Sequence, residues 1–234
     1  MVIGSLSGYD TLCRLICVQS DCIIVSVGYH LAPEHKFSLA IDDAYGAFLW
    51  VLQHAENFGG DENNIAISGD SAGGSLAAVV TILARDQGIS NIKCQVLIYP
   101  ATASHAHSSS HLAFANGYFL ERDTVLWFQE SYIVSDKDSE DFRYAPLIAK
   151  ELTHLPPTLI IVSGYATLRD EGVAYADRLT ASGVDVSLQE YPGMFYPFVS
   201  LAGVLDEGRE AISAVGKALR KFTQNYSLAD AVSN

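Results

Sequence analysis

Basic residues are scarce in this sequence, where 14 lysines and arginines stand against 27 acidic residues and give a formal net charge of −13. A chain of that sign repels the phosphates of nucleic acid. The longest apolar stretch, 76–84 with one threonine in it, is far shorter than the ~20 residues that a membrane span needs. The first residues also lack the basic region and apolar core of a secretory leader. We therefore expect no nucleic-acid partner, no membrane span and a cytoplasmic location.

No pattern of metal-ligand residues with a known spacing stands out in the sequence. The four cysteines lie within apolar stretches, where a free thiol packs as a small hydrophobic side chain, so we favour core packing over disulfides. His105, His107 and His111 lie close together, and three imidazoles can hold zinc. Their spacing matches no metal motif and carboxylates are not close by, so we favour a polar loop. We expect neither a metal site nor a cofactor.

Strand-like and helix-like patterns alternate along the 234 residues, which is the length of one α/β domain that buries roughly 70% of its unfolded surface. This alternation predicts a mostly parallel sheet flanked by helices. The expected strands are 22–28, 65–68, 94–100, 158–164 and 185–191. The expected helices are 8–20, 38–57, 72 to about 87, 171–183 and 206–222.

A long insert from 101 to about 155 interrupts this alternation within the single domain 1–234. Inserts of this length on a compact sheet are usually lids or binding loops, so a lid is expected here. Its aromatic side chains either line an acyl pocket or pack the insert itself. They are Tyr118, Phe119, Trp127, Phe128 and Tyr132.

The sequence Gly69-Asp70-Ser71-Ala72-Gly73 fits the pattern G-x-S-x-G, follows an expected strand and opens an expected helix. Such a strand-to-helix turn exposes the serine hydroxyl at the top of the sheet, and small neighbours allow the sharp bend. We predict that Ser71 is a nucleophile and that the Ala72 N–H is an oxyanion donor at the helix N-terminus. The alternative is a small-residue turn that only packs a helix on a sheet.

Several stretches carry a resemblance to one family, the hormone-sensitive-lipase-like carboxylesterases of the α/β-hydrolase fold. The resemblance implies hydrolysis of short acyl esters by a Ser-Asp-His triad, with Ser71 as the nucleophile of the GDSAG motif and a small acyl ester or related apolar molecule as ligand. The stretches are GYHLAPEHKFSLAIDDAYGAFLWV, GDSAGGSLAA, LIYP, GYFLERD, LPPTLIIVSGYATLRDEGVAYADRL and YPGMFYPF.

The sequence departs from this family at its other functional positions. The family's aspartate is expected where the chain has Ala166 in GYATLRDE, and its histidine where the chain has Tyr196 in PGMFYPF. All seven histidines precede residue 155, and Asp170 is the only nearby carboxylate that could replace the acid. The family's H-G-G-G oxyanion motif, expected just before residue 1, is missing. A phenol of pKa ~10 is a poor base, so very low or absent activity is expected.

Two other interpretations stay open at this point. One is a non-catalytic small-molecule binding module, because the plant gibberellin receptors belong to the same family and also lack the histidine. The other is a gene fragment or a deliberately inactivated form. All three interpretations share one prediction. The chain derives from a carboxylesterase-type hydrolase, its catalytic triad is degenerate, and whether it is an enzyme is left open by the sequence.

The resemblance also implies a shortened fold without the N-terminal cap and the first three strands. About five strands would remain, and the segment 22–28 would lack its direct neighbour. It must therefore pair with 65–68 or leave a gap that is open to another chain. Exposed apolar surface of this kind predicts a homodimer or an aggregation-prone chain.

Overall fold

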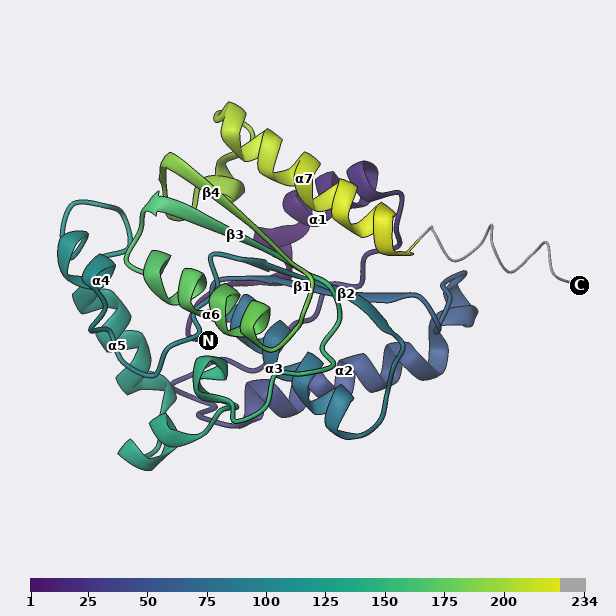
Figure 1. Cartoon of the computed structure of the whole chain (residues 1–234), viewed down its shortest axis with the longest axis horizontal. Helices are drawn as coiled ribbons and strands as arrows, with labels where there is room; N and C mark the ends of the chain where they lie inside the picture. Colours follow the sequence, from purple (N-terminus) through teal and green to yellow (C-terminus); the bar gives the residue numbers. More distant parts are fainter. Residues whose placement is uncertain (224–234) are drawn as a thin grey trace, which may run out of the picture.

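A computed structural model describes residues 1–223, so residues 224–234 of the predicted domain lie outside the described residues. Four strands form one sheet in the order β1-β2-β3-β4, and each neighbouring pair is parallel (Figure 1). The strands are β1 (Ile65–Asp70), β2 (Ile92–Ile98), β3 (Thr158–Tyr165) and β4 (Val186–Phe195). The expected parallel sheet is thereby confirmed.

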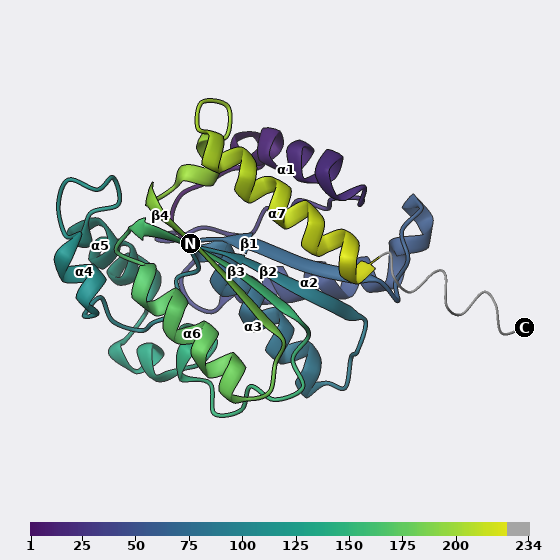
Figure 2. The same ribbon diagram turned by 45° about the horizontal axis from the view of Figure 1, so that its top comes forward.

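Helices cover both faces of this sheet (Figure 2). On one face α1 and α7 pack closely together, since a Cβ at Gly216 of α7 would lie 2.5 Å from the Gln19 carbonyl oxygen of α1. The other face carries α3 and α6, and α2 packs against α3. The helices are α1 (Leu6–Ser20), α2 (Leu39–His54), α3 (Ala72–Asp86), α6 (Arg169–Ala181) and α7 (Asp206–Thr223).

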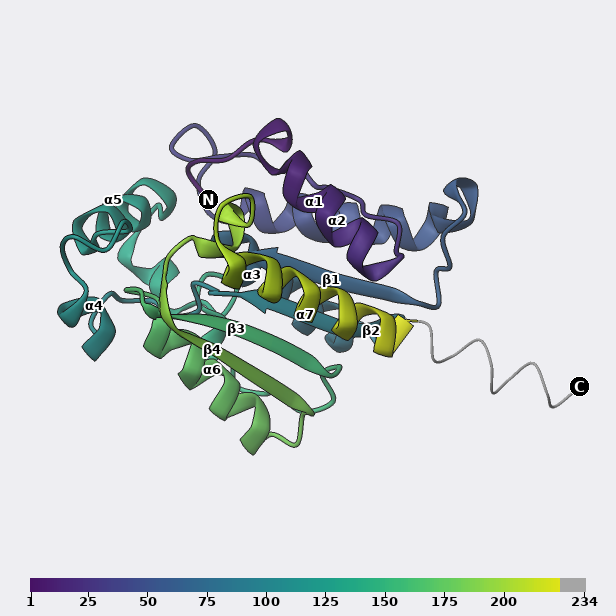
Figure 3. The ribbon, with the colours of Figure 1, turned by 90° about the horizontal axis from the view of Figure 1, so that it is seen from above.

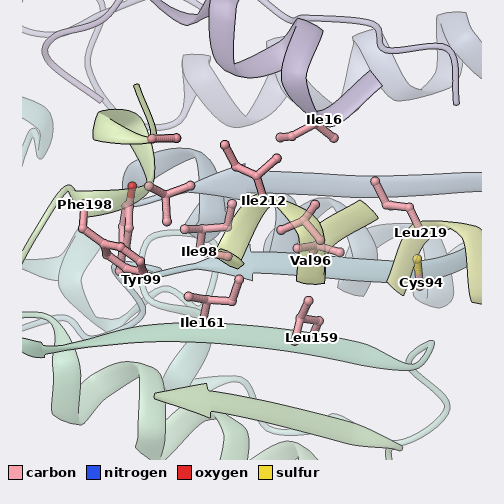
Figure 4. Close-up of a cluster of buried hydrophobic side chains, with 14 residues drawn as sticks. Ile16, Cys94, Val96, Ile98, Tyr99, Leu159, Ile161, Phe198, Ile212 and Leu219 are labelled. Carbon is pink, nitrogen blue, oxygen red and sulfur yellow. The ribbon is translucent and has the colours of Figure 1, made fainter. Parts of the chain in front are cut away.

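Alternate residues of the central strands fill two cores. Val96 and Ile98 of β2 point to the α1/α7 side, where Ile212 of α7 joins them (Figure 4). Leu97, between them in sequence, points to the opposite face and packs with Leu179 of α6. This period of two, with apolar side chains on both faces, is what a parallel strand buried between helix layers requires. It explains why the runs at β2 and β3 could be located from sequence.

The prediction of a strand at 22–28, and with it the count of about five strands, is wrong. The segment has no regular secondary structure, and the backbone groups of 23–28 make no hydrogen bond with any of residues 1–223. A strand exists only when a neighbour accepts and donates its ladder hydrogen bonds, and none lies beside this segment. The segment 22–28 was expected either to pair with 65–68 or to leave a gap beside it, and the structure shows the gap. Seen from above, the β1 edge of the sheet lies beside α1 and α2 (Figure 3).

The insert folds into short helices at the end of the sheet to which the arrows of β3 and β4 point (Figure 1). Its role as a lid stays a prediction. The elements are α4 (Ser109–Ala113), α5 (Arg122–Tyr132) and the 3-10 helices η2 (Asp136–Glu140) and η3 (Pro146–Ile148); two further 3-10 turns, η1 (Ala55–Phe58) and η4 (Phe198–Leu201), lie elsewhere.

Within residues 1–223, no helix combines the length and the apolar character needed to cross a bilayer. The same residues contain no cluster of three or more side chains placed to hold a metal ion. Cys94 is buried in the core beneath α7, and the other three cysteines are partly buried and free.

Candidate active site

Ser71 forms the turn between β1 and α3 with φ 51° and ψ −119°. This left-handed backbone is costly for a residue with a side chain and is kept only where the surroundings enforce it. Here the Ser71 N–H donates to the Ile98 carbonyl oxygen at 2.9 Å, and the Ser71 carbonyl accepts from the Ala101 N–H at 3.1 Å. The carboxyl end of β2 therefore holds the serine in its strained position.

Glycine is required at two positions around this turn. A Cβ added to Gly69 would lie 2.1 Å from the Gly73 carbonyl oxygen, and one added to Gly74 would lie 2.9 Å from the Pro100 Cβ. At Gly73 the nearest atom would be an Asp70 carboxylate oxygen 3.9 Å away. The close approach that the sequence pattern predicts is therefore made by Gly69 and by Gly74, which the pattern did not single out, while Gly73 has room for a side chain.

The hydroxyl of Ser71 is not used to cap α3. Ser71 and Tyr196 line the same cleft, and the nearby Ser71 hydroxyl acts to lower the pKa of the Tyr196 phenol. The Ala72 N–H, at the first residue of α3, makes no backbone hydrogen bond with the described residues. A free N–H at the positive end of a helix suits the developing negative charge of an oxyanion. The structure thus brings Ser71, Ala72 and Tyr196 together.

Tyr196 and Ala166 follow the carboxyl ends of β4 and β3. Burial raises the pKa of the Tyr196 phenol above its usual value, although the hydrogen bond with Ser71 partly opposes this rise. The Tyr196 ring packs edge-on against Tyr99, with the ring centroids 5.0 Å apart. Ala166 is 1% exposed. A phenol that is protonated at neutral pH is a poor acceptor for the serine proton, and a methyl group cannot orient a base.

Asp70, the residue before the serine, points to the α1 side of the turn. Its carboxylate accepts a hydrogen bond from the Tyr9 hydroxyl at 3.1 Å. Burial raises the pKa of Asp70 to about 6, although the hydrogen bond with Tyr9 opposes this rise. Burial, followed by the nearby Asp70 charge, raises the pKa of Tyr29 to about 12. Sequence reasoning missed Tyr9 and Tyr29 because their partner lies far along the chain.

The other candidate groups are engaged elsewhere. Asp170 accepts from the Ser110 N–H at 2.8 Å and pairs with Arg169, which ties α4 to the start of α6. His111 is buried with its Nδ1 2.7 Å from the Ser108 hydroxyl, and burial lowers its pKa to about 4. The rings of His105 and His107 stack on each other. In the described chain none of these groups is hydrogen-bonded to Ser71 or Tyr196.

A cleft of about 840 Å³ opens at Ser71 and continues along the free edge of β1. Asp70, Ser71 and Tyr196 line one part of it, and no histidine belongs to its described lining. Among the five aromatic residues of the insert, Phe128 alone lines the cleft, and the others pack against further rings. The arrangement provides a serine hydroxyl, a free backbone N–H and a partly apolar space, and no imidazole belongs to the described lining.

Comparison with known proteins gives this geometry a context. A family model described as the alpha/beta hydrolase fold matches residues 1–200. A carboxylic ester hydrolase, LipN of Mycobacterium tuberculosis, is 42% identical over 205 residues that cover 85% of this chain and 54% of that protein. An ethyl acetate hydrolase of Pseudomonas putida is 35% identical over 94% of this chain and 70% of its own length.

Solved structures show the same likeness. The carboxylesterase EstE1, cloned from a metagenomic library, superposes with a TM-score of 0.93 at 40% identity and covers 95% of this chain and 76% of its own. The chain thus spans about half the length of LipN and about three quarters of the EstE1 chain.

Proposed function

The chain belongs to the α/β-hydrolase fold family, and on that premise we propose a carboxylesterase-type serine hydrolase domain whose own turnover is very low or absent. Its relatives include carboxylesterases, which makes it a carboxylesterase-family α/β hydrolase. The finer assignment, to the hormone-sensitive-lipase-like group with Ser71 as nucleophile in the GDSAG motif, is part of the proposal. So are the vacant acid position at Ala166 and the base position taken by Tyr196.

The observation that carries this proposal is the backbone of Ser71. Its φ of 51° between a strand and a helix is the geometry of a nucleophile elbow, and Gly69 allows the bend by lacking a Cβ. The Tyr196 phenol lines the same cleft as Ser71 and is near enough to the serine hydroxyl for that hydroxyl to affect its pKa. The elbow positions the serine, but the protonated phenol beside it is a poor base. We therefore expect a site that binds an ester but attacks it slowly.

Short acyl esters are the proposed substrate class. The Pseudomonas putida relative is named for ethyl acetate, the ester of a two-carbon acid. The cleft beside Ser71 is lined by apolar side chains together with Asp70 and Tyr9, which suits a neutral ligand with a small polar end.

Restoring the missing groups tests the proposal directly. We expect negligible hydrolysis of p-nitrophenyl acetate by the unmodified chain and no gain from Ala166→Asp alone. Tyr196→His should give a small gain, and the pair about a hundredfold gain, because an aspartate orients an imidazole only when the imidazole is present. Initial rates at neutral pH measure each step.

Ser71→Ala in the doubly substituted chain is the control, and it should remove the whole gain. Brisk hydrolysis by the unmodified chain that Ser71→Ala abolishes would contradict the proposed roles of Ala166 and Tyr196. A gain that survives Ser71→Ala would show that the added histidine acts without the elbow.

A non-catalytic binding module of the same fold is the second candidate. The cleft of about 840 Å³ has ligand-sized volume, and its described lining includes Ser71 but no histidine. Saturable binding of a nonhydrolysable alkyl phosphonate amide, without turnover of any ester and with loss of affinity in Leu76→Arg, would favour this candidate. Leu76 lies in the cleft lining.

Assembly and location stay predictions. Exposed apolar side chains beside the free β1 edge support self-association, either as a homodimer or as soluble aggregates. Light scattering that shows a monomer at high concentration would contradict this. A cytoplasmic location is likewise a proposal.

A further inference from the structure

A short segment at the carboxyl end of β2, residues 99–103, contacts two of the candidate functional positions. At its start the Tyr99 ring packs on the Tyr196 ring, with the ring centroids 5.0 Å apart. In its middle the Ala101 N–H donates to the Ser71 carbonyl oxygen at 3.1 Å. A shift of this segment would therefore move the serine relative to the position at which the family has its base.

The path of this segment depends on contacts with other elements. Tyr99 has φ 34°, in the left-handed region that costs free energy for a residue with a side chain. The Pro100 ring lies between two helices. A Cβ added to Gly74 of α3 would lie 2.9 Å from the Pro100 Cβ, and one added to Gly172 of α6 would lie 3.6 Å from the Pro100 Cδ. The first turns of α3 and α6 therefore hold the segment from two sides.

Glu171, in the first turn of α6, forms the polar contacts with this segment. Its carboxylate accepts from the Ala103 N–H at 2.8 Å, and its backbone carbonyl accepts from the Thr102 hydroxyl at 2.9 Å. The Glu171 residue is 4% exposed. Within residues 1–223 the Ala103 N–H has no backbone acceptor, so loss of the carboxyl would leave this donor without a partner in the described chain.

The third functional position lies at the start of the same helix. Ala166 comes five residues before Glu171, and its carbonyl oxygen accepts from the Arg169 N–H, at the first residue of α6, at 3.1 Å. The first turn of α6 therefore joins the position at which the family has its acid to the segment 99–103. The Glu171 carboxylate is the side chain that links the helix with that segment.

We propose that Glu171 is a positioning residue, whose carboxyl fixes the segment 99–103 against α6 and thereby sets the place of Ser71 relative to positions 166 and 196. This role rests on the proposed function, because it concerns the geometry of that site. Glu171 does not belong to the described lining of the cleft at Ser71. It therefore acts through the segment and not on a bound ester.

The charge of Glu171 changes within an accessible pH range. Burial raises its pKa to about 8, and the Ala103 and Thr102 backbones oppose this rise. Tyr144 of the insert lies near it, since burial and then the Glu171 carboxyl raise the pKa of Tyr144. The neighbouring Asp170 is paired with Arg169. An ionised carboxylate is the stronger acceptor, so the hydrogen bond from Ala103 should strengthen as the pH rises through about 8.

Amide resonances of the isotope-labelled, unmodified chain test the link without any catalysis. We expect the Ala103 amide to move downfield with a midpoint near pH 8, and the Ala101 and Ser71 amides to move with the same midpoint. Glu171→Gln keeps an acceptor oxygen but cannot ionise, so all three titrations should disappear in this variant.

Glu151 provides the matched control. Its carboxylate also accepts a backbone N–H, that of Thr153 at 2.9 Å, but it is exposed and lies near the end of the insert. Glu151→Gln should therefore leave the titrations of Ala103, Ala101 and Ser71 unchanged.

Rates in the chain that carries Ala166→Asp and Tyr196→His provide the second measurement. Glu171→Met removes the acceptor and should lower kcat by about tenfold to a hundredfold with little change in KM, because a small misplacement of a nucleophile slows the chemical step. Glu171→Gln should restore most of this rate, and Glu151→Met should leave it unchanged. Circular dichroism verifies the fold, and if Glu171→Met misfolds, the amide titrations still decide the question.

Three results would overturn the proposal. An Ala103 amide with the same pH dependence in Glu171→Gln as in the unmodified chain would remove the contact itself. A titration of Ala103 that the Ala101 and Ser71 amides do not follow would make Glu171 a local buried acceptor. Equal kcat values for folded Glu171→Met and Glu151→Met would do the same.

Failure of the proposed function gives a different result. The doubly substituted chain would then not hydrolyse the ester at all, whatever residue stands at 171. The amide titrations of the unmodified chain would still show whether the Glu171 carboxyl sets the place of Ser71.

Discussion

The turn between β1 and α3 and the loops after β3 and β4 contribute to the same candidate site, but they are specified in different ways. At the turn the backbone itself is constrained, since a Cβ at Gly69 would lie 2.1 Å from the Gly73 carbonyl oxygen. At the two loops the constraint is only space, which Ala166 and Tyr196 fill with apolar contacts: Ala166 is buried and Tyr196 packs on Tyr99.

With the proposed roles of Ser71, Ala166 and Tyr196, this difference would explain how the fold keeps the turn while it loses the base. A change at Gly69 would disturb the path of the chain between strand and helix, so it costs stability. In the proposed function, the replacement of an acid by Ala166 and of an imidazole by Tyr196 alters only side chains and leaves the core packed. A site of this fold can therefore lose its chemistry without losing its architecture.

The comparison of the β1–α3 turn with the two loops predicts that the largest loss of stability follows a substitution at Gly69. Gly69→Ala should lower the free energy of unfolding by about 3 kcal/mol or more, because the contact is with backbone and cannot relax by a side-chain rotation. Gly73→Ala, in the first turn of α3, is the matched control. It should be neutral or stabilise by up to about 1 kcal/mol. Urea denaturation of both variants measures the difference, and equal effects would refute a backbone-defined elbow.

The Asp70 side chain, on the same turn, should have a smaller effect on the free energy of unfolding, and this effect should depend on pH. Burial raises the pKa of Asp70 to about 6 in the folded chain, from an ordinary value of 3.8. The folded state therefore holds this proton more tightly than the unfolded state. The stability that the carboxyl contributes is fully present below about pH 3.8 and is lost as the pH rises through about 6.

Asp70→Asn removes this titration. Relative to the unmodified chain, the variant should gain up to about 3 kcal/mol between acidic and neutral pH, since each pKa unit is worth about 1.4 kcal/mol. Denaturation curves from about pH 4 to about pH 8 measure the gain. The exposed Asp177→Asn is the control and should show little change. A gain for Asp70→Asn that does not vary with pH would contradict the buried carboxyl.

The smallest effect is expected in the loop after β4. Tyr196→Phe keeps the ring against Tyr99 and removes the hydroxyl that faces Ser71, so it should cost about 0.5–1.5 kcal/mol. A double-mutant cycle with Ser71→Ala isolates the hydrogen bond, and a coupling near zero would show that the two hydroxyls do not interact. A loss as large as that of Gly69→Ala would remove the distinction between the two regions.

Sequence patterns located most elements within a few residues. The expected helix 8–20 is α1 (Leu6–Ser20), and the expected strand 158–164 is β3 (Thr158–Tyr165). These elements were predictable because hydrophobic period and capping signals are local. The insert was recognised as an interruption, but its helices α4 and α5 were not predicted because their patterns are short and mixed.

The residues of the candidate site also fall into two groups, those that sequence motifs could assign and those that only the structure brings together. Ser71, Ala166 and Tyr196 could be assigned from motifs, and their roles stay predictions. The hydrogen bond between Tyr9 and Asp70 joins residues 61 positions apart and leaves no local trace. His111 resembled a metal ligand in sequence, yet the structure uses it as a buried side chain on the Ser108 hydroxyl.

The sequence by itself determined where the long helices outside the insert lie, where the β1–α3 turn lies and that no histidine follows residue 154 within the 234 residues. Only the tertiary structure decided that 22–28, whose composition is that of a strand, is not one. The physical reason is that a helix satisfies its backbone within a few residues, whereas a strand depends on hydrogen bonds to a neighbour that the sequence of the segment does not contain. The cleft beside β1 is the consequence.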